Sequence, residues 1–335
     1  MIRKTAPAML RVEGVARRAA LLCTAFLLTA CMTSLADPPA PGAGGDTHPT
    51  FSRQTMEHEG RTRHYLVHDF SGDNPAPVVF ILHGGGGHAE NAVDMSQFDV
   101  IAAREKLIAV YPAGTGGTPG GRLLTWNAGH CCAYARENQV DDVGFIARII
   151  DDLVSSGNAD AGRIYVTGMS NGGMMAHRLG LELSDRIAAI APVVGALFGD
   201  EVPPATYQPV ASLMIIGATD AIVPGAGGPL AGRGDSRRRI ARRPEDRDTI
   251  SARAAADFWA GANGCGVAVQ QTTAAADMLS YPDCQDDAEV VLVTVADNGH
   301  AWPGGRPGRA EADPPTMAWN ASEEMWRFFA RHGRR

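Results

Sequence analysis

At the centre of the chain stands Tyr165-Val166-Thr167-Gly168-Met169-Ser170-Asn171-Gly172-Gly173-Met174. In it, a β-branched run meets the motif Gly-x-Ser-x-Gly, and small and methionine residues typical of a helix follow. This order predicts a nucleophile elbow, a sharp strand-to-helix turn whose glycines avoid steric clashes. Such a turn presents the Ser170 hydroxyl above the sheet. The alternative is a Ser-Asn helix cap at a tight junction.

A second glycine-rich segment follows the apolar run 77–82, which predicts a strand buried on both faces. It reads His83-Gly84-Gly85-Gly86-Gly87-His88. Four consecutive glycines cost conformational entropy, so we expect their backbone N–H groups to approach a ligand closely. In a serine hydrolase the ligand atom is an oxyanion, and we predict that the amides of Gly85 and Asn171 bind it. A phosphate-binding loop is the alternative, but the Gly-Lys-Ser/Thr ending that it requires is missing.

Two further apolar runs end in residues that suit a catalytic triad. The run 210–217 leads to Asp220, and the run 289–295 leads to His300. In chain order, Ser170, Asp220 and His300 match the nucleophile, acid and base of an α/β-hydrolase. The alternative for Asp220 is an ordinary turn residue.

These three residue types form a chemical unit. A serine hydroxyl is a weak nucleophile at neutral pH, so it needs an imidazole to take its proton. The imidazole in turn needs a carboxylate to fix its tautomer. This chemistry requires neither a metal nor an organic cofactor, and we expect none. Asp141 and Asp142 could also be interpreted as catalytic carboxylates, but the apolar helical pattern after them favours a helix cap.

Aromatic residues in irregular segments are candidates for the wall of a cleft. Loops as long as the segment 112–138 are usually functional or disordered. This one contains Trp126 and Tyr134, and Trp302 closely follows His300. We predict that these three aromatic residues bind the substrate. Burial in the core is the alternative for each.

Composition and pattern predict one large α/β domain with a mostly parallel sheet flanked by helices. The chain is 45% hydrophobic and 20% charged, and its formal net charge of −7 gives no reason to expect a nucleic-acid partner. Alternating residues in 55–59 and 61–68 predict an edge hairpin. Further strands are expected at 107–111 and 187–194, and helices at 91–106, 249–262 and 315–329.

The first thirty residues predict export. Arg17 and Arg18 precede an apolar run that is too short to span a bilayer and typical of a signal peptide. The run ends Leu28-Thr29-Ala30-Cys31, which resembles a lipobox and predicts a lipid anchor on Cys31. Cleavage near Ser34-Leu35-Ala36, releasing a secreted protein, is the alternative. We therefore expect a signal peptide at 1–31, a flexible linker at 32–50 and the catalytic domain at 51–335.

Four cysteines follow the signal segment: Cys131, Cys132, Cys265 and Cys284. An even number in an exported protein indicates disulfides. Cys265 and Cys284 both lie in loop-like sequence, so we predict that they pair. Cys131 and Cys132 then form a vicinal bridge or stay as thiols. Since no zinc-ligand spacing accompanies them, we expect no metal site.

Five segments carry a shared signature: Leu82-His83-Gly84-Gly85-Gly86-Gly87, Trp126-Asn127-Ala128-Gly129-His130-Cys131-Cys132, Val140-Asp141-Asp142-Val143-Gly144-Phe145, Gly168-Met169-Ser170-Asn171-Gly172-Gly173-Met174 and Gly299-His300-Ala301-Trp302-Pro303-Gly304-Gly305. Together they resemble the secreted esterase and poly(3-hydroxybutyrate) depolymerase family, which is related to feruloyl and acetyl-xylan esterases. The resemblance covers residues 55–330. It implies an α/β-hydrolase fold, carboxylic ester hydrolysis and the triad Ser170, Asp220 and His300.

This chain departs from the family in two places. The family pattern Gly-Thr-x-Asp near the acid is Gly217-Ala218-Thr219-Asp220 here. The arginine-rich segment 225–248 is less typical, and its mixed charges predict a solvated surface insertion.

The sequence therefore predicts an exported serine esterase. Its expected partner is an ester substrate, either feruloyl or acetyl groups on plant polysaccharide or short polyester oligomers. A surface-anchored binding protein on the same scaffold is one alternative, although a binder has no need of a complete triad and glycine loop. A peptidase of the same fold is another, but the chain shows no propeller-like repeats or added domain to gate peptides.

Overall fold

The computed structural model describes residues 50–72, 75–117, 123–231, 247–309 and 312–334. All of them belong to the larger of two units in the chain, Asp46–Arg335. The predicted signal peptide with Cys31 and the predicted linker up to residue 49 lie outside the described residues, as do the arginines between 232 and 246. In the part that is described, none of the helices combines the length and apolar character needed to cross a bilayer.

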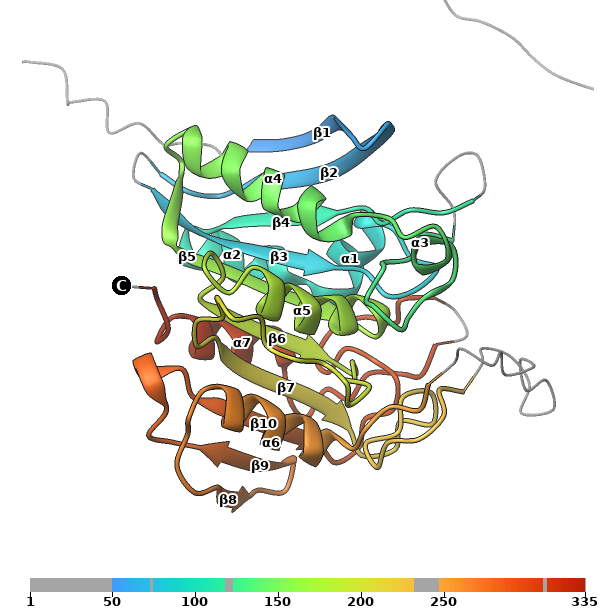
Figure 1. Ribbon diagram of the computed structural model, residues 1–335, viewed down its shortest axis with the longest axis vertical. Helices are drawn as coiled ribbons and strands as arrows, with labels where there is room; N and C mark the ends of the chain where they lie inside the picture. Colours follow the sequence, from blue (N-terminus) through green and yellow to red (C-terminus); the bar gives the residue numbers. More distant parts are fainter. Residues whose placement is uncertain (1–49, 73–74, 118–122, 232–246, 310–311, 335) are drawn as a thin grey trace, which may run out of the picture. The chain divides into compact units, whose positions relative to one another are not determined.

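A ten-stranded sheet runs through the described residues in the order β1-β2-β4-β3-β5-β6-β7-β10-β9-β8 (Figure 1). The six strands from β4 to β10 are parallel, and antiparallel pairs form both edges. The strands are β1 (Thr50–His58), β2 (Arg61–Asp69), β3 (Ala76–Leu82), β4 (Ile108–Pro112), β5 (Ala159–Met169), β6 (Ala189–Val193), β7 (Ala211–Gly217), β8 (Val269–Thr272), β9 (Ala276–Tyr281) and β10 (Val290–Val295). This arrangement confirms the predicted mostly parallel sheet and edge hairpin.

Helices cover both faces of the sheet. They are α1 (Ala89–Ser96), α2 (Phe98–Glu105), α3 (Ala133–Glu137), α4 (Asp142–Ser155), α5 (Asn171–Glu182), α6 (Ala252–Ala262) and α7 (Ala321–Phe329), with a short 3-10 turn at Gln285–Asp287. Helices α4, α5 and α6 pack on one face, and α1, α2 and α7 pack on the other (Figure 1).

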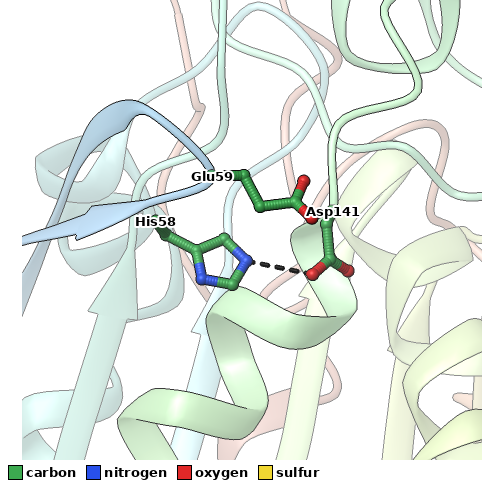
Figure 2. A group of neighbouring side chains, drawn as sticks. All are labelled: His58, Glu59 and Asp141. Carbon is green, nitrogen blue, oxygen red and sulfur yellow. Dashed lines mark hydrogen bonds and ion pairs between the residues drawn. The ribbon is translucent and has the colours of Figure 1, made fainter.

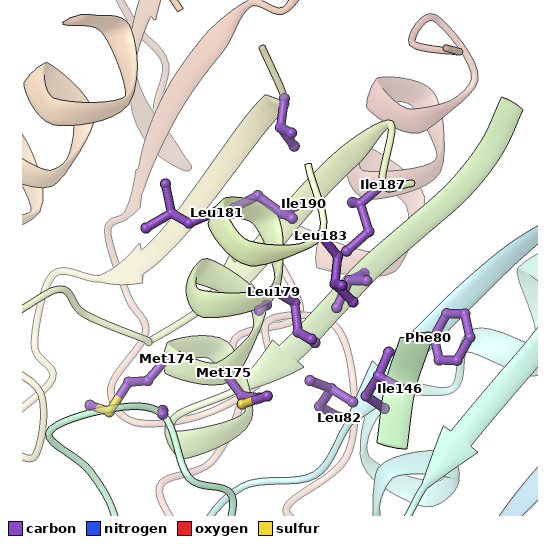
Figure 3. Close-up of a cluster of buried hydrophobic side chains, with 14 of the residues drawn as sticks. Phe80, Leu82, Ile146, Met174, Met175, Leu179, Leu181, Leu183, Ile187 and Ile190 are labelled. Atoms are coloured by element: carbon purple, nitrogen blue, oxygen red, sulfur yellow. The ribbon is translucent and has the colours of Figure 1, made fainter. Parts of the chain in front are cut away.

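Strand β3 shows why the sheet needs helices on both sides. Its residues are all buried, and they alternate between the two cores: Phe80 and Leu82 face one, and Ile81 faces the other. Because successive side chains of a strand point to opposite faces, a strand covered on both sides must be apolar throughout. Figure 3 shows the first core, where Phe80 and Leu82 meet Ile146 of α4 and Leu179 of α5. This packing holds α5 directly behind the strand that carries the elbow.

Two predicted helices differ from the observed ones. The single helix expected at 91–106 is wrong, because Gln97 adopts a left-handed conformation (φ 53°) and separates α1 from α2. The Ser96 hydroxyl donates to the carbonyl of Ala92 and accepts from the amide of Phe98, so local side-chain bonds replace the helical ones. The helix expected from residue 315 begins only at Ala321, where the Asn320 side chain caps the first turn.

The antiparallel pair β8 and β9 was not predicted. Both strands lie between Cys265 and Cys284, where β9 extends the sheet beyond β10. All four residues of β8 are exposed, so the segment lacks the alternation from which a strand is predicted.

Packing at the elbow requires glycine at position 172. A Cβ atom at Gly172 would lie 2.5 Å from the carbonyl oxygen of His83 and 2.6 Å from that of Leu82. Since both obstacles are backbone atoms, we predict that Gly172→Ala lowers the free energy of unfolding by about 3 kcal/mol, measured by urea denaturation. Gly261→Ala in α6 is the matched control, because its Cβ would meet nothing within 4 Å. It should raise stability by about 0.5 kcal/mol, and equal stability of the two variants would contradict this account.

Candidate active site

Four loops meet at one edge of the sheet because they follow four parallel strands. The glycine loop follows β3, Ser170 follows β5, Asp220 follows β7 and His300 follows β10. In Figure 1 these strands point the same way, so their carboxyl ends share one side. Strands β3 and β5 are neighbours, as are β7 and β10. The first pair brings the glycine loop beside Ser170, and the second brings Asp220 beside His300.

Ser170 lies in a strained turn between β5 and α5. Its φ of 57° is a left-handed value that a residue with a Cβ rarely adopts. The Ser170 amide donates to the carbonyl of Val193 at 2.9 Å, which holds the turn against β6. Although Ser170 occupies the N-cap position of α5, its side chain caps no amide. The hydroxyl is therefore not used as a helix cap, which was the alternative interpretation of the motif.

Asp220 and His300 form a buried pair. Nδ1 of His300 lies 2.8 Å from Oδ2 of Asp220, and both side chains are at least 95% buried. The other carboxylate oxygen, Oδ1, accepts from the amides of Ile222 and Val223 at 2.8 and 2.9 Å. Because a carboxylate can only accept, the proton on Nδ1 points to Asp220 and Nε2 keeps its lone pair.

The free nitrogen of the pair is available for proton transfer. Nε2 of His300 is buried and has no hydrogen-bond partner in the described part of the chain. Ser170 and His300 line the same cavity, but no hydrogen bond joins them in this structure. Catalytic hydrogen bonds of this kind are often long until a substrate is bound.

The cavity has a volume of about 390 Å³. Its polar wall is formed by Gly84, Gly85, Gly86, Gly87, His88, Asn91, Ser170, His300, Gly308, Arg309 and Asp313, and its apolar wall by Met95, Leu123, Met169, Ile222, Ala301, Trp302 and Ala312. A concave, partly apolar space with a few convergent polar groups is the usual form of a small-molecule site.

The backbone amides of the glycine loop differ in their hydrogen bonding. The amide of Gly86 donates to Leu124 at 2.7 Å, and that of Gly87 donates to Gly84 at 2.9 Å. The amides of Gly84 and Gly85 have no such partner among the described residues, and both glycines line the cavity. On the other side of the cavity, the amide of Asn171 lies in the first turn of α5, where helical N–H groups have no intrahelical acceptor. The predicted oxyanion donors, the amides of Gly85 and Asn171, are therefore both without a backbone acceptor in the part of the chain that the structure describes.

A buried histidine supports the glycine loop from below. Nε2 of His83 accepts from the amide of Gly114 at 3.0 Å, so Nδ1 carries the proton and donates to the carbonyl of Gly84 at 2.8 Å. Burial lowers the pKa of His83 to about 4, which keeps the ring neutral at physiological pH. His83 therefore connects the glycine loop to the segment after β4.

The side chain of Asn171 has a structural function that the motif did not reveal. Its Oδ1 accepts from the amide of Trp126 at 2.7 Å, and its Nδ2 donates to the carbonyl of the same residue at 3.0 Å. Trp126 itself is fully buried, and its indole N–H donates to the carbonyl of His83 at 3.0 Å. Trp126 thus lies in the core beneath the site, and the substrate contact predicted for it does not fit this position.

The other two predicted cleft aromatics differ in position. Trp302 lines the cavity, although only 1% of its surface is exposed, and its indole N–H donates to Ser322 at 3.1 Å. Tyr134 does not line the cavity; its hydroxyl accepts from Arg61 at 3.3 Å on β2. Of the three, only Trp302 is placed where a substrate could reach it.

Asn298 connects the loops of Asp220 and His300. It is fully buried, and its carbonyl accepts from the amide and hydroxyl of Thr219 at 3.1 and 2.9 Å. Its side-chain amide donates to the carbonyls of Gly299 and Ala301 at 2.9 and 3.0 Å. Sequence reasoning missed this residue, and the only available signal was its position two residues before His300.

The two neighbouring aspartates lie outside the cavity and hold other elements together. Asp141 caps α4 through the amide of Gly144 at 2.8 Å, and its second oxygen lies 3.0 Å from Nε2 of His58 at the end of β1 (Figure 2). Asp142 is fully buried and bonds Arg63 of β2 at 2.7 Å. The helix-cap interpretation is therefore confirmed for Asp141, and Asp142 ties the edge hairpin to α4.

The cysteines form two bridges in the described residues. Cys265 and Cys284 form a disulfide, as predicted, and it closes the segment that contains β8 and β9. Cys131 and Cys132 form a vicinal disulfide across a cis peptide bond, the first of the two alternatives considered.

Comparisons with known proteins show which sequences this chain is related to. No protein-family model matches the chain. NocK of Nocardia uniformis subsp. tsuyamanensis, which is named as an esterase, is 29% identical over 329 residues, or 87% of this chain and 91% of that protein. Feruloyl esterase B of Piromyces equi is 30% identical over 244 residues, or 71% of this chain, and the match spans 42% of its length. Poly(3-hydroxyalkanoate) depolymerase C of Paucimonas lemoignei is 26% identical over 120 residues, covering 36% of this chain and 28% of that protein.

Solved structures share the fold. Acetyl xylan esterase from Aspergillus awamori matches with a TM-score of 0.52 and 15% identity, covering 75% of this chain and 94% of that chain. A thermostable esterase matches with a TM-score of 0.52 and 16% identity, covering 85% of this chain and 63% of that chain. At these identities the likeness concerns the fold alone. The chain is therefore a carboxylic ester hydrolase with the α/β-hydrolase fold, similar in sequence to proteins named esterase, feruloyl esterase and poly(3-hydroxyalkanoate) depolymerase.

Proposed function

We propose that this protein is an exported serine esterase that cleaves carboxylic esters through an acyl-enzyme. Ser170 is the nucleophile, His300 the general base, and Asp220 the residue that orients His300. One observation carries the proposal: a serine in a strained elbow shares a cavity with a histidine whose Nδ1 is held by a buried carboxylate. A binding protein would gain nothing from maintaining the strain at Ser170.

The proposed reaction proceeds in two halves. His300 Nε2 takes the proton of Ser170 as Oγ attacks the acyl carbon, and Asp220 stabilises the imidazolium. The amides of Gly85 and Asn171 hold the oxyanion, an effect of about 3 kcal/mol for each donor. His300 then gives the proton to the leaving alcohol, and water releases the acid by the same steps. The scheme uses no metal and no organic cofactor.

The proposed substrates are the ester classes in the names of the relatives, which include feruloyl esterase, acetylxylan esterase and poly(3-hydroxyalkanoate) depolymerase. The cavity supports this choice because Met95, Met169 and Ile222 form an apolar wall beside Ser170 that suits an acyl chain. Trp302 belongs to the same wall and is the remaining aromatic candidate for substrate contact.

Export rests on the sequence of the first residues and on one structural feature. The Cys265–Cys284 disulfide supports an oxidising compartment, since such bonds rarely persist in the cytosol. The proposed lipid anchor at Cys31 would tether the enzyme to a membrane, whereas cleavage at Ser34-Leu35-Ala36 would release it. The mass of the mature N-terminal peptide decides between these two forms.

Labelling and a substrate panel test the proposed function. We expect a fluorophosphonate probe to modify the wild-type protein on the peptide that contains Ser170, located by mass spectrometry. The same protein should hydrolyse p-nitrophenyl acetate, methyl ferulate and a hydroxybutyrate dimer ester far faster than a peptide anilide. Folded protein that neither labels nor turns over any ester would support the binding-protein alternative. Faster cleavage of the anilide would support the peptidase.

A further inference from the structure

The backbone of His300 is held by a second carboxylate. Oδ2 of Asp313 accepts a hydrogen bond from the His300 amide at 2.7 Å. Asp313 lies 13 residues further along the chain, in the segment between β10 and α7. A hydrogen bond to a charged acceptor is about twice as strong as one between neutral groups. His300 is thus bound by one carboxylate at its ring and by another at its main chain.

The contact between Asp313 and the histidine loop is close. A Cβ atom at Gly299 would lie 2.4 Å from Oδ2 of Asp313, so any side chain at position 299 would displace the carboxylate. Glycine at this position therefore allows the carboxylate to rest against the loop and reach the next amide. Asp313 also lines the cavity that contains Ser170 and His300.

Asp313 completes a set of contacts that restrains the loop. The Asn298 side chain binds the carbonyls of Gly299 and Ala301, on either side of the histidine. The amide of His300 points to neither of these groups and is taken by Asp313. The bond between Nδ1 and Asp220 fixes the ring at one atom only, so the position of Nε2 also depends on where the backbone is held. Misplacing a catalytic group by 1 Å can cost about 100-fold in rate.

We propose that Asp313 is a positioning residue for the general base. It holds the main chain of His300 so that Nε2 stays directed into the cavity, while Asp220 holds the ring. Asp313 touches no reacting atom and acts through His300. This inference rests on the proposed serine esterase function.

Kinetics of four variants test the proposal. For Asp313→Ala we expect kcat to fall about 10- to 100-fold with KM unchanged, by the same factor for acetyl and butyryl p-nitrophenyl esters. Asp313→Asn keeps an acceptor oxygen and should recover most of the rate. Gly299→Ala displaces the carboxylate from the other side and should reproduce the loss in kcat. Asp297→Ala is the control, because it removes an exposed carboxylate near the same loop and should match the wild type.

Each result decides the proposal. An Asp313→Ala variant as active as Asp297→Ala would overturn it. A change confined to KM, or one that differs between the two esters, would assign Asp313 to substrate binding and would also overturn it. If Asp313→Ala does not fold, the other two variants decide. A kcat that is retained in Asp313→Asn and lost in Gly299→Ala supports the positioning role, and equal kcat values in these two variants refute it. Ester turnover that survives in Ser170→Ala would instead reject the underlying esterase assignment.

Discussion

Ser170→Ala is expected to lower kcat for p-nitrophenyl acetate by about 10⁴-fold or more while leaving the protein folded. Without Oγ there is no nucleophile and no acyl-enzyme, so only the oxyanion donors and the cavity can accelerate the reaction. The hydroxyl makes no hydrogen bond within the described residues, so its loss leaves no polar group without a partner. Stability should therefore change by no more than about 0.5 kcal/mol. Initial rates and thermal melting measure the two effects.

Ser212→Ala is the matched control for this prediction. Ser212 is fully buried on β7 of the same sheet, and its hydroxyl also lacks a partner in the described part of the chain. The control variant should keep wild-type turnover, because Ser212 does not line the cavity. Undiminished hydrolysis by Ser170→Ala would refute the assignment of the nucleophile. Equal loss in both variants would attribute the effect to general damage.

Asp220→Asn is the second variant for which we expect a large effect, a fall in kcat of about 10⁴-fold. Oδ1 of Asp220 accepts from the amides of Ile222 and Val223, so the single carbonyl oxygen of asparagine is required at that position. The NH₂ group must then face Nδ1 of His300, which becomes an acceptor. The proton moves to Nε2, the nitrogen that has to accept it from Ser170. The wrong tautomer, rather than a broken fold, causes the loss.

A comparison with Asp220→Ala separates the effect of the wrong His300 tautomer on kcat from the effect of lost hydrogen bonds on stability. Alanine leaves the amides of Ile222 and Val223 without their acceptor, so this variant should be less stable than Asp220→Asn by about 1 to 3 kcal/mol. Both should show similarly low kcat values, measured with p-nitrophenyl acetate and accompanied by melting curves. An Asp220→Asn variant within tenfold of wild-type turnover would contradict the proposed role.

The local sequence pattern was sufficient to predict the strands, the turn and the helix that build the site. A β-branched run, a Gly-x-Ser-x-Gly motif and a helical pattern predicted β5, the turn at Ser170 and α5, and the structure has all three. The apolar run before the glycine loop predicted β3 for the same reason. Such runs become parallel strands whose carboxyl ends share an edge, and this places the loops of Ser170, Asp220 and His300 on one side of the sheet. Their catalytic roles remain a prediction.

Contacts between segments far apart in the chain could not be predicted from the local sequence pattern. A substrate contact was expected for Trp126 because it lies in a long irregular segment. In the structure, the Asn171 side chain binds the main chain of Trp126, and Trp126 lies in the core. The break at Gln97 was also invisible, because a single polar residue in a helical pattern carries no signal of left-handed backbone.

The amino-acid sequence by itself determined the buried strands that carry the site, the elbow and the loops with polar side chains, because hydrophobic periodicity and the placement of glycine are local properties of the chain. Only the tertiary structure decided which of those side chains meet. The contact between Asn298 and Thr219 joins loops 79 residues apart in sequence and arises from the packing of β7 against β10. The contact between Asp313 and His300 spans 13 residues and arises because the segment between β10 and α7 folds back on itself beside the cavity.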